Sequence, residues 1–210
     1  MVEAIERLES MRHGAWNVAN IDRKDCIVDV AQALAAIGQE SLLRRFLDWQ
    51  FFHERYPLIT VQIPAAAQLA TQAKDIVKQS SAVQDWIRRI DESLQMQTQS
   101  APKRPTNWQR PSKLSCTCAD CVQLAEFLAS PATAEARFPM AKQRRQHLHG
   151  IIERDRCDCT HETLRVGSPQ VLVCKKTNGS YDRACQEYKR DLEHLDAIQK
   201  IIAKFSADPR

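Results

Sequence analysis

Three cysteines lie within six residues of the chain, in the order Cys116-x-Cys118-x-x-Cys121. The C-x-x-C spacing lets a tight turn bring two thiolates onto one tetrahedral metal ion, and the third thiol is close enough to join them. We expect Cys121 to lie in the first turn of a helix, where the helix dipole favours the thiolate form that binds metal. Three sulfur ligands leave one position of a tetrahedron to be filled.

His147 is the candidate for the fourth position. A helix is predicted from Pro139 to about residue 154, and at 3.6 residues per turn it places His147 on the inward face and His149, rotated by about 200°, on the outward face. The alternative is a core histidine that is hydrogen-bonded to backbone. Thiolates with an imidazole in a closed tetrahedron are typical of structural zinc. The predicted zinc ligands are Cys116, Cys118, Cys121 and His147.

A second cluster, Cys157-x-Cys159 with His161, offers two more thiols and an imidazole. It could share one site with the first cluster, form a second site, or stay free of metal. Because a C-x-C pair alone is a weak signal, we rank first a single zinc site at the first cluster, with these three residues as second-choice ligands. A redox C-x-x-C is disfavoured because the βαβ context of thioredoxin-like proteins is missing. The remaining cysteines, Cys26, Cys174 and Cys185, are expected in cores.

The elements that must position these residues are mostly helices. Residues 1–97 are predicted to be helical throughout, as a bundle or a helical array, with helices near 25–37, 42–51, 65–77 and 82–94. Residues 98–113 contain three prolines, four cations and no acid, which predicts an extended basic linker. Within it, Trp108 is expected to dock on a neighbouring domain or, as the alternative, to stack on a base.

Residues 114–210 are predicted to form a small zinc-stabilised α+β module. Helices are expected at 120–129 and 139–154, then a β-hairpin of 163–166 and 170–174 around Gly167-Ser168-Pro169. A long helix, 181–205, follows, with Ser180 as its cap and one apolar stripe that we expect to pack in a core. The fold class is therefore mainly α, a helical amino-terminal half joined to an α+β module.

Composition narrows the function classes. The amino terminus has no uninterrupted apolar segment of a signal peptide, and no run approaches the roughly 18 apolar residues of a membrane span, so we expect an intracellular protein of the cytoplasm, nucleus or nucleoid. Glycine-rich phosphate loops, a nucleophile elbow and H-E-x-x-H are missing from the sequence. We therefore expect no catalytic residues and no small-molecule substrate.

Cations concentrate in the linker, in the helix before the hairpin and at the hairpin, although the net charge is only +4. Such a surface could contact phosphates; the alternative is that these cations only face solvent. Nucleic acid is thus one expected partner, and another protein is the other. The predicted nucleic-acid contacts are Lys103, Arg104, Arg110, Arg144, Arg145, Arg165, Lys175 and Lys176.

Residues Leu114 to Leu195 resemble the carboxy-terminal region of large prolyl-hydroxylase-like 2-oxoglutarate/Fe(II) oxygenase proteins. The shared motifs are C-x-C-x-x-C, R-x-H-L and T-x-R-x-G-S-P-x-x-L-V-x-x-K-T, in this order. The matched positions are Cys116, Cys118, Cys121, Arg145, His147, Arg165, Gly167, Pro169 and Lys176. The catalytic domain itself is not matched, because the one His-x-Asp, His194-Leu195-Asp196, lies in a predicted helix with no histidine after it.

These observations lead to two function hypotheses. The first is a non-catalytic, zinc-stabilised binding or accessory module that contacts nucleic acid through its basic surface. The alternative, which rests on the resemblance, is a regulatory or substrate-positioning region of a 2-oxoglutarate/Fe(II) oxygenase.

Overall fold

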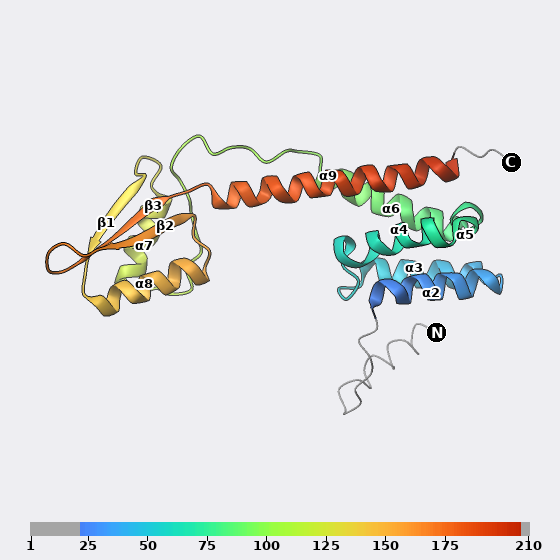
Figure 1. Ribbon diagram of the computed structural model, residues 1–210, viewed down its shortest axis with the longest axis horizontal. Coiled ribbons are helices and arrows are strands. Elements are labelled where there is room, and N and C mark those ends of the chain that lie inside the picture. The colour runs from blue at the N-terminus through green and yellow to red at the C-terminus, as the bar shows by residue number, and fades with distance from the viewer. Residues whose placement is uncertain (1–21, 207–210) are drawn as a thin grey trace, which may run out of the picture. The chain divides into compact units, whose positions relative to one another are not determined.

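The computed structural model of the chain describes residues 22–206 and divides into two compact units. Unit 1 comprises the described residues up to Ser100 together with those from Lys189 onward, and unit 2 comprises Ala101–Tyr188 (Figure 1). Helices dominate the described chain, and the sheet is confined to unit 2, so the mainly α fold class is confirmed. The predicted helicity of residues 1–21 lies outside the described residues.

Unit 1 is made of helices with short connections. They are α2 (Arg23–Ala36), α3 (Glu40–Phe52), the π-helical turn η2 (Leu58–Gln62), α4 (Ile63–Gln72), α5 (Lys74–Gln79), α6 (Ser81–Gln97) and the later part of α9 (Gly179–Ser206). Gly38 ends the first helix with φ +67°, a left-handed conformation that glycine adopts without strain. The helix predicted at 65–77 is in fact two, because the backbone breaks at Ala73.

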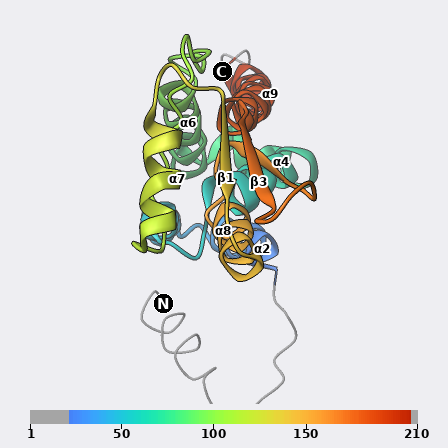
Figure 2. The same ribbon diagram turned by 90° about the vertical axis from the view of Figure 1, so that its left-hand side faces the viewer.

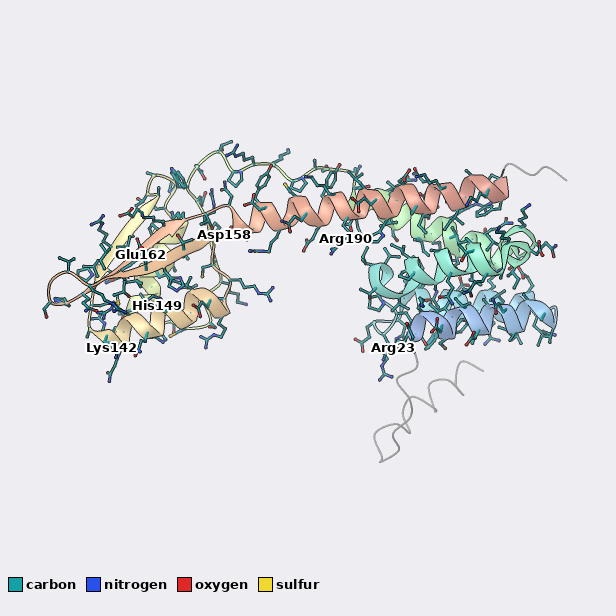
Figure 3. The ribbon with its side chains drawn as sticks, viewed as in Figure 1. Arg23, Lys142, His149, Asp158, Glu162 and Arg190 are labelled. Atoms are coloured by element: carbon teal, nitrogen blue, oxygen red, sulfur yellow. The ribbon has the colours of Figure 1, made fainter. Side chains whose placement is uncertain are left out.

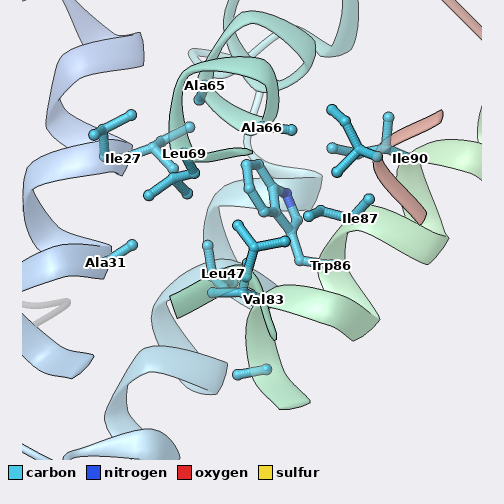
Figure 4. Close-up of a cluster of buried hydrophobic side chains, with 14 of the residues drawn as sticks. Ile27, Ala31, Leu47, Ala65, Ala66, Leu69, Val83, Trp86, Ile87 and Ile90 are labelled. Atoms are coloured by element: carbon cyan, nitrogen blue, oxygen red, sulfur yellow. The ribbon is translucent and has the colours of Figure 1, made fainter. Parts of the chain in front are cut away.

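The core of unit 1 surrounds the indole of Trp86 on α6 (Figure 4). Ile27 of α2, Leu47 of α3 and Leu69 of α4 are all buried in the same cluster. The ring nitrogen of Trp86 donates a 3.2 Å hydrogen bond to the buried side chain of Gln62 in η2. The cluster is completed from the far end of the sequence, by Ile198, Ile201 and Phe205 of α9.

The predicted division into 1–97, 98–113 and 114–210 differs from these units at its last boundary. Residues from Lys189 on belong to unit 1, so the apolar stripe of α9 packs in that core over its last turns only, and Leu192 is 40% exposed. Periodicity marks a face as apolar, but it does not say which core the face joins.

Unit 2 contains a three-stranded antiparallel sheet in the order β1-β3-β2, and Figure 2 shows β1 next to β3. The strands are β1 (Glu135–Pro139), β2 (Cys159–Leu164) and β3 (Val171–Lys176), and the helices are α7 (Ala119–Ala129) and α8 (Lys142–Arg154). The predicted hairpin is present as β2 and β3, but β2 begins at Cys159 and ends at Leu164, earlier than the predicted 163–166. The first strand was not predicted, and Pro139 ends this strand instead of opening α8.

One face of this sheet builds the core of unit 2. Leu172 and Cys174 of β3 point toward the helices and are fully buried with Leu124 of α7 and Leu148 of α8. Phe138 of β1 adds an edge-to-face ring contact with Phe127 of α7. Both helices therefore lie over the same side of the sheet.

Most of the predicted linker, from Ala101 on, belongs to unit 2. Arg110 is only 6% exposed. Its amide donates to the carbonyl oxygen of Leu128 at 2.7 Å, and its guanidinium donates to the carbonyl of Thr177 at 2.7 Å and to Asn178 Oδ1 at 2.6 Å. The amide of Trp108 also bonds to the carbonyl of Pro131 at 3.0 Å. These bonds fix an irregular segment that no composition rule would assign to a folded unit.

The start of α9 is capped by Asp158 and not, as predicted, by Ser180. The amide and the hydroxyl of Ser180 both donate to Asp158 Oδ1, at 2.7 and 2.9 Å. A carboxylate at a helix amino terminus accepts hydrogen bonds from free amides and is stabilised by the positive end of the helix dipole. Asp158 lies between two cysteines just before β2, so only the tertiary fold brings it to this helix.

Candidate metal centre

The thiols of Cys116, Cys118 and Cys121 and a ring nitrogen of His147 all lie within 4.8 Å of one another. Cys116 comes from the loop before α7, Cys118 is the residue that caps α7, and Cys121 lies in its first turn, as predicted. His147 reaches them from α8. Among the described residues, this is the one group of metal-binding side chains that comes together in this way.

Two of the donor-atom distances are close to the edges of a tetrahedral metal site. The Nε2 atom of His147 is 3.5 Å from the sulfur of Cys118 and 3.3 Å from that of Cys121. A zinc ion with Zn–S bonds of about 2.3 Å and a Zn–N bond of about 2.0–2.1 Å has S···N edges of about 3.6 Å. The four side chains could therefore hold one metal ion, and the protein would supply every ligand.

Two carboxylates hold the elements of the centre together. Asp120 of α7 forms a two-point ion pair with Arg144 of α8, with one contact at 2.8 Å, and the hydrogen bond from Arg144 lowers the pKa of Asp120. Asp155, just after α8, accepts from the amide and hydroxyl of Ser115 at 2.7 and 2.9 Å, and the bond from that amide lowers the pKa of Asp155. The loop before Cys116 and the two ligand helices are thus tied to each other.

The thiols differ in acidity. The amide of Cys121 donates to the sulfur of Cys118 and, with the neighbouring thiols and His147, lowers the pKa of Cys118 to about 7. Burial, together with the neighbouring thiols, raises the pKa of Cys121 to about 12. The exposed thiol of Cys118 therefore ionises more readily than the buried thiol of Cys121, which must release a proton when it binds a metal.

The structure corrects the predicted orientations on α8. His147 is exposed, whereas His149 is half-buried, with its ring 4.4 Å from that of His161 and its Nε2 3.2 Å from the hydroxyl of Thr163. Arg145 and Leu148 are the residues that point into the unit. The metal cluster lies at the edge of the core, so its histidine occupies the side of the helix and not its apolar centre.

The second cluster does not join the first. Cys157 and Cys159 are buried in the core of unit 2 and neither belongs to the ligand group. A hydrogen bond with the thiol of Cys174, together with burial, raises the pKa of Cys159, and burial raises that of Cys157 to about 11. These thiols are neutral core groups in the structure, while His161 lies against His149.

Several predicted nucleic-acid contacts have structural roles instead. Arg110, Arg145 and Lys176 are 6–7% exposed. Arg145 donates to the carbonyl of Met140 at 2.6 Å. The ammonium of Lys176 donates to the carbonyl of Ser130 at 2.6 Å and lies over the ring of Phe127. For Arg110 and Lys176, the prediction of an open phosphate contact is wrong, because charge alone does not separate a surface cation from one that bonds buried carbonyls.

The other predicted contacts remain on the surface. Lys103, Arg104 and Arg165 are exposed. Arg144 is 56% exposed in its side chain but paired with Asp120, and Lys175 lies 3.8–3.9 Å from two glutamates. Trp108, which is expected to dock, is 43% exposed; its amide bonds to the carbonyl of Pro131, and it lines a hollow of about 390 Å³ with Arg104 and Asn178. A basic surface therefore exists, but it is smaller than the sequence indicates.

Fold and site together define a mainly helical protein with a three-cysteine, one-histidine cluster that could hold a metal ion. Comparisons of the chain with protein-family models, with curated proteins and with solved structures find no match. In the described part of the chain, every helix is too short or too polar to cross a membrane.

Proposed function

We propose that unit 2 is a non-catalytic binding module built around a structural zinc ion, and that its partner is nucleic acid. The proposal has a metal part and a partner part. Each has its own experiment, so one can fail while the other stands.

The ligand chemistry supports zinc as the ion. Three thiolates and one imidazole suit zinc, whereas hard cations such as Mg²⁺ and Ca²⁺ take oxygen ligands. Because the protein fills all four tetrahedral positions, none remains for a water or a substrate. A closed site of this kind stabilises a fold and performs no chemistry.

Elemental analysis of the purified chain tests the metal. We expect one equivalent of zinc per chain, lost in Cys118→Ser and in His147→Ala. Cys185→Ser is the matched control, because this thiol lies on α9 outside the cluster and its loss should leave the zinc content unchanged. An unchanged zinc content in His147→Ala would reject the ligand assignment.

The observation that carries the partner is the half-exposed ring of Trp108 in a hollow next to Arg104. Its surroundings are basic, since unit 2 has 14 Lys and Arg against 9 Asp and Glu, a net charge of +5, while the rest of the chain has −1. The guanidinium of Arg110 lies 5.9 Å from the ring centroid. An aromatic ring among cations is the arrangement on which unpaired bases stack while their phosphates meet positive charge.

Binding of fluorescent single-stranded RNA and DNA across a salt series tests the partner. We expect affinity to fall steeply with salt, and Trp108→Ala to weaken binding by about 1–3 kcal/mol, as the loss of one stacked base does. Trp108→Phe, which keeps a flat ring, should retain most of the affinity. If neither RNA nor DNA binds at low salt, or if Trp108→Ala binds as well as the parent, this partner is rejected.

The second candidate, an accessory region of a 2-oxoglutarate/Fe(II) oxygenase, is supported by the resemblance and by one contact. Arg145, which matches the R-x-H-L motif, donates to Gln170, which directly follows the matched Gly167-Ser168-Pro169. Two separated matching motifs thus meet in one place. Mass spectrometry of proteins that co-purify with the chain tests it: an oxygenase recovered with the parent but not with Arg145→Leu supports it, and its absence from both counts against it.

A further inference from the structure

A polar cleft of about 430 Å³ lies between α8 and the β2–β3 hairpin, apart from the hollow at Trp108. Figure 3 labels Lys142 and His149 on the helix that forms one wall. The lining residues are Lys142, Arg145, Gln146, His149, Thr163, Arg165 and Gln170.

Two polar stripes face each other in this cleft. On α8, positions 142, 145, 146 and 149 have the i, i+3, i+4, i+7 spacing of one helix face. From the hairpin, Thr163 follows His161 at the period of two that keeps strand side chains on one face, and Arg165 comes directly after β2 and also lines the cleft. His149 joins the two walls through its contacts with Thr163 and His161. Helix and strand faces that meet are usually apolar, so a polar pair needs a reason.

The charge of the cleft has one sign. Three lining residues are cations and none is an acid. Arg145 is 7% exposed and is held by Met140 and Gln170, yet no described residue accepts from its Nε–H. In the part of the chain that the structure describes, Lys142 and Arg165 form no ion pair, whereas neighbouring Arg144 does.

The amino terminus of α8 adds to this positive field. Lys142 is its first residue, and the preceding Ala141 has no side chain that could accept from the free amides of the first turn. Helices of this length usually begin with Ser, Thr, Asp or Asn for that purpose. An anion in the cleft would meet both the side-chain cations and the positive end of the helix dipole.

We propose that this cleft binds a phosphate group carried on a small ester or a strand end, with Arg145 as its fixed donor and Lys142 and Arg165 closing over it. Phosphate has the charge and the several acceptor oxygens that three cations, a threonine and two glutamines can satisfy together. The volume exceeds that of phosphate alone and leaves room for the group that carries it. The inference does not depend on nucleic-acid binding at Trp108, nor on which metal the cysteines hold.

Phosphate titrations of the isotope-labelled, metal-loaded chain, followed by NMR in chloride buffer, test the site. Inorganic phosphate and a nucleoside 5′-monophosphate are the two probes. We expect saturable shifts of the amides of Lys142, Arg145 and Thr163 with both. Tighter binding of the nucleotide would show that the site also contacts the group that carries the phosphate. Equal binding of the two probes would show that it recognises phosphate alone.

Matched substitutions decide between a built site and general attraction. Lys142→Gln and Arg165→Gln remove exposed cations, so both should fold, and each should weaken phosphate binding at least about tenfold by removing a charge-assisted hydrogen bond. Lys113→Gln removes an exposed cation of the same unit outside the cleft and should change affinity less than twofold. Equal weakening in all three variants, non-saturable shifts, or shifts away from α8 and β2 would overturn the proposal.

Discussion

Removing the proposed zinc ion is expected to unfold unit 2 and leave unit 1 folded. Unit 2 has about 90 residues, and at about 0.05–0.15 kcal/mol per residue its total stability is about 4–13 kcal/mol. A structural zinc ion contributes an apparent 10–16 kcal/mol at pH 7. The metal is therefore worth about as much as the whole unit.

The composition of the two cores supports this magnitude. The buried core of unit 2 contains Cys121, Cys157, Cys159 and Cys174 among its twelve members, and cysteine buries less apolar surface than Leu or Ile. The core of unit 1 has 22 buried members, and none of them is a metal ligand. The expected outcome thus follows from the difference between the cores.

Hydrogen exchange read by mass spectrometry, with and without a chelator, checks the prediction. After metal removal, the amides of β3 and α8 should exchange fully, while those of α3 and α6 stay protected. Cys121→Ser should behave like the chelated parent, and Cys185→Ser like the untreated one. If β3 remains protected in the metal-free chain, the unit does not need its metal and the reasoning is refuted.

Three further predictions concern single contacts. Glu40→Gln should destabilise unit 1 by about 1 kcal/mol at pH 7, because burial opposes ionisation of Glu40 but hydrogen bonds from Ala82, Ser80 and Ser81 outweigh it and lower its pKa. This stabilisation is present above the unfolded-state pKa of about 4.3 and is lost as the pH falls through the lower pKa of the folded state. Urea titrations along a pH series would measure it. Gln62→Leu should cost unit 1 about 2–3 kcal/mol in urea denaturation, because it strands the Trp86 N–H and two backbone carbonyls. Arg110→Ala should cost unit 2 about 2 kcal/mol, a fall of about 10 °C in the Tm of the metal-loaded protein, because buried carbonyl acceptors lose their donor.

The Gln62 and Arg110 predictions each have a control of the same type. Gln79→Leu and Arg104→Ala change exposed residues and should have effects within about 0.5 kcal/mol. A Glu40→Gln penalty that stays constant down to pH 3 would contradict the electrostatic account. Equal effects for the Gln62 and Gln79 variants, or for the Arg110 and Arg104 variants, would show that burial of the hydrogen bonds does not matter.

Local signals in the sequence were sufficient for the helices and for the ligand group. Gly38 and the apolar periodicity placed α2, and the C-x-C-x-x-C spacing with His147 predicted the four side chains that meet. Such features depend on residues close together in the chain, or on a cysteine spacing that is typical of metal binding.

What the sequence could not give depends on tertiary partners. The strand Glu135–Pro139 is short, ends in proline and is recognisable only from its pairing with β3. The buried cations Arg110 and Lys176 are satisfied by backbone carbonyls that come from distant segments. The cleft beside α8 had a signal in the polar spacing of positions 142, 145, 146 and 149, but its second wall is known only from the fold.

Unit 1 is discontinuous in the chain, and this has a consequence for its folding during translation. Residues 22–100 leave the ribosome before unit 2, yet Ile198, Ile201 and Phe205, which complete their core, are translated only after it. Unit 2 is contiguous, so all of it has been synthesised by then. The nascent chain therefore carries an open apolar surface throughout synthesis of the inserted unit, and the module that is second in sequence is the first that can close.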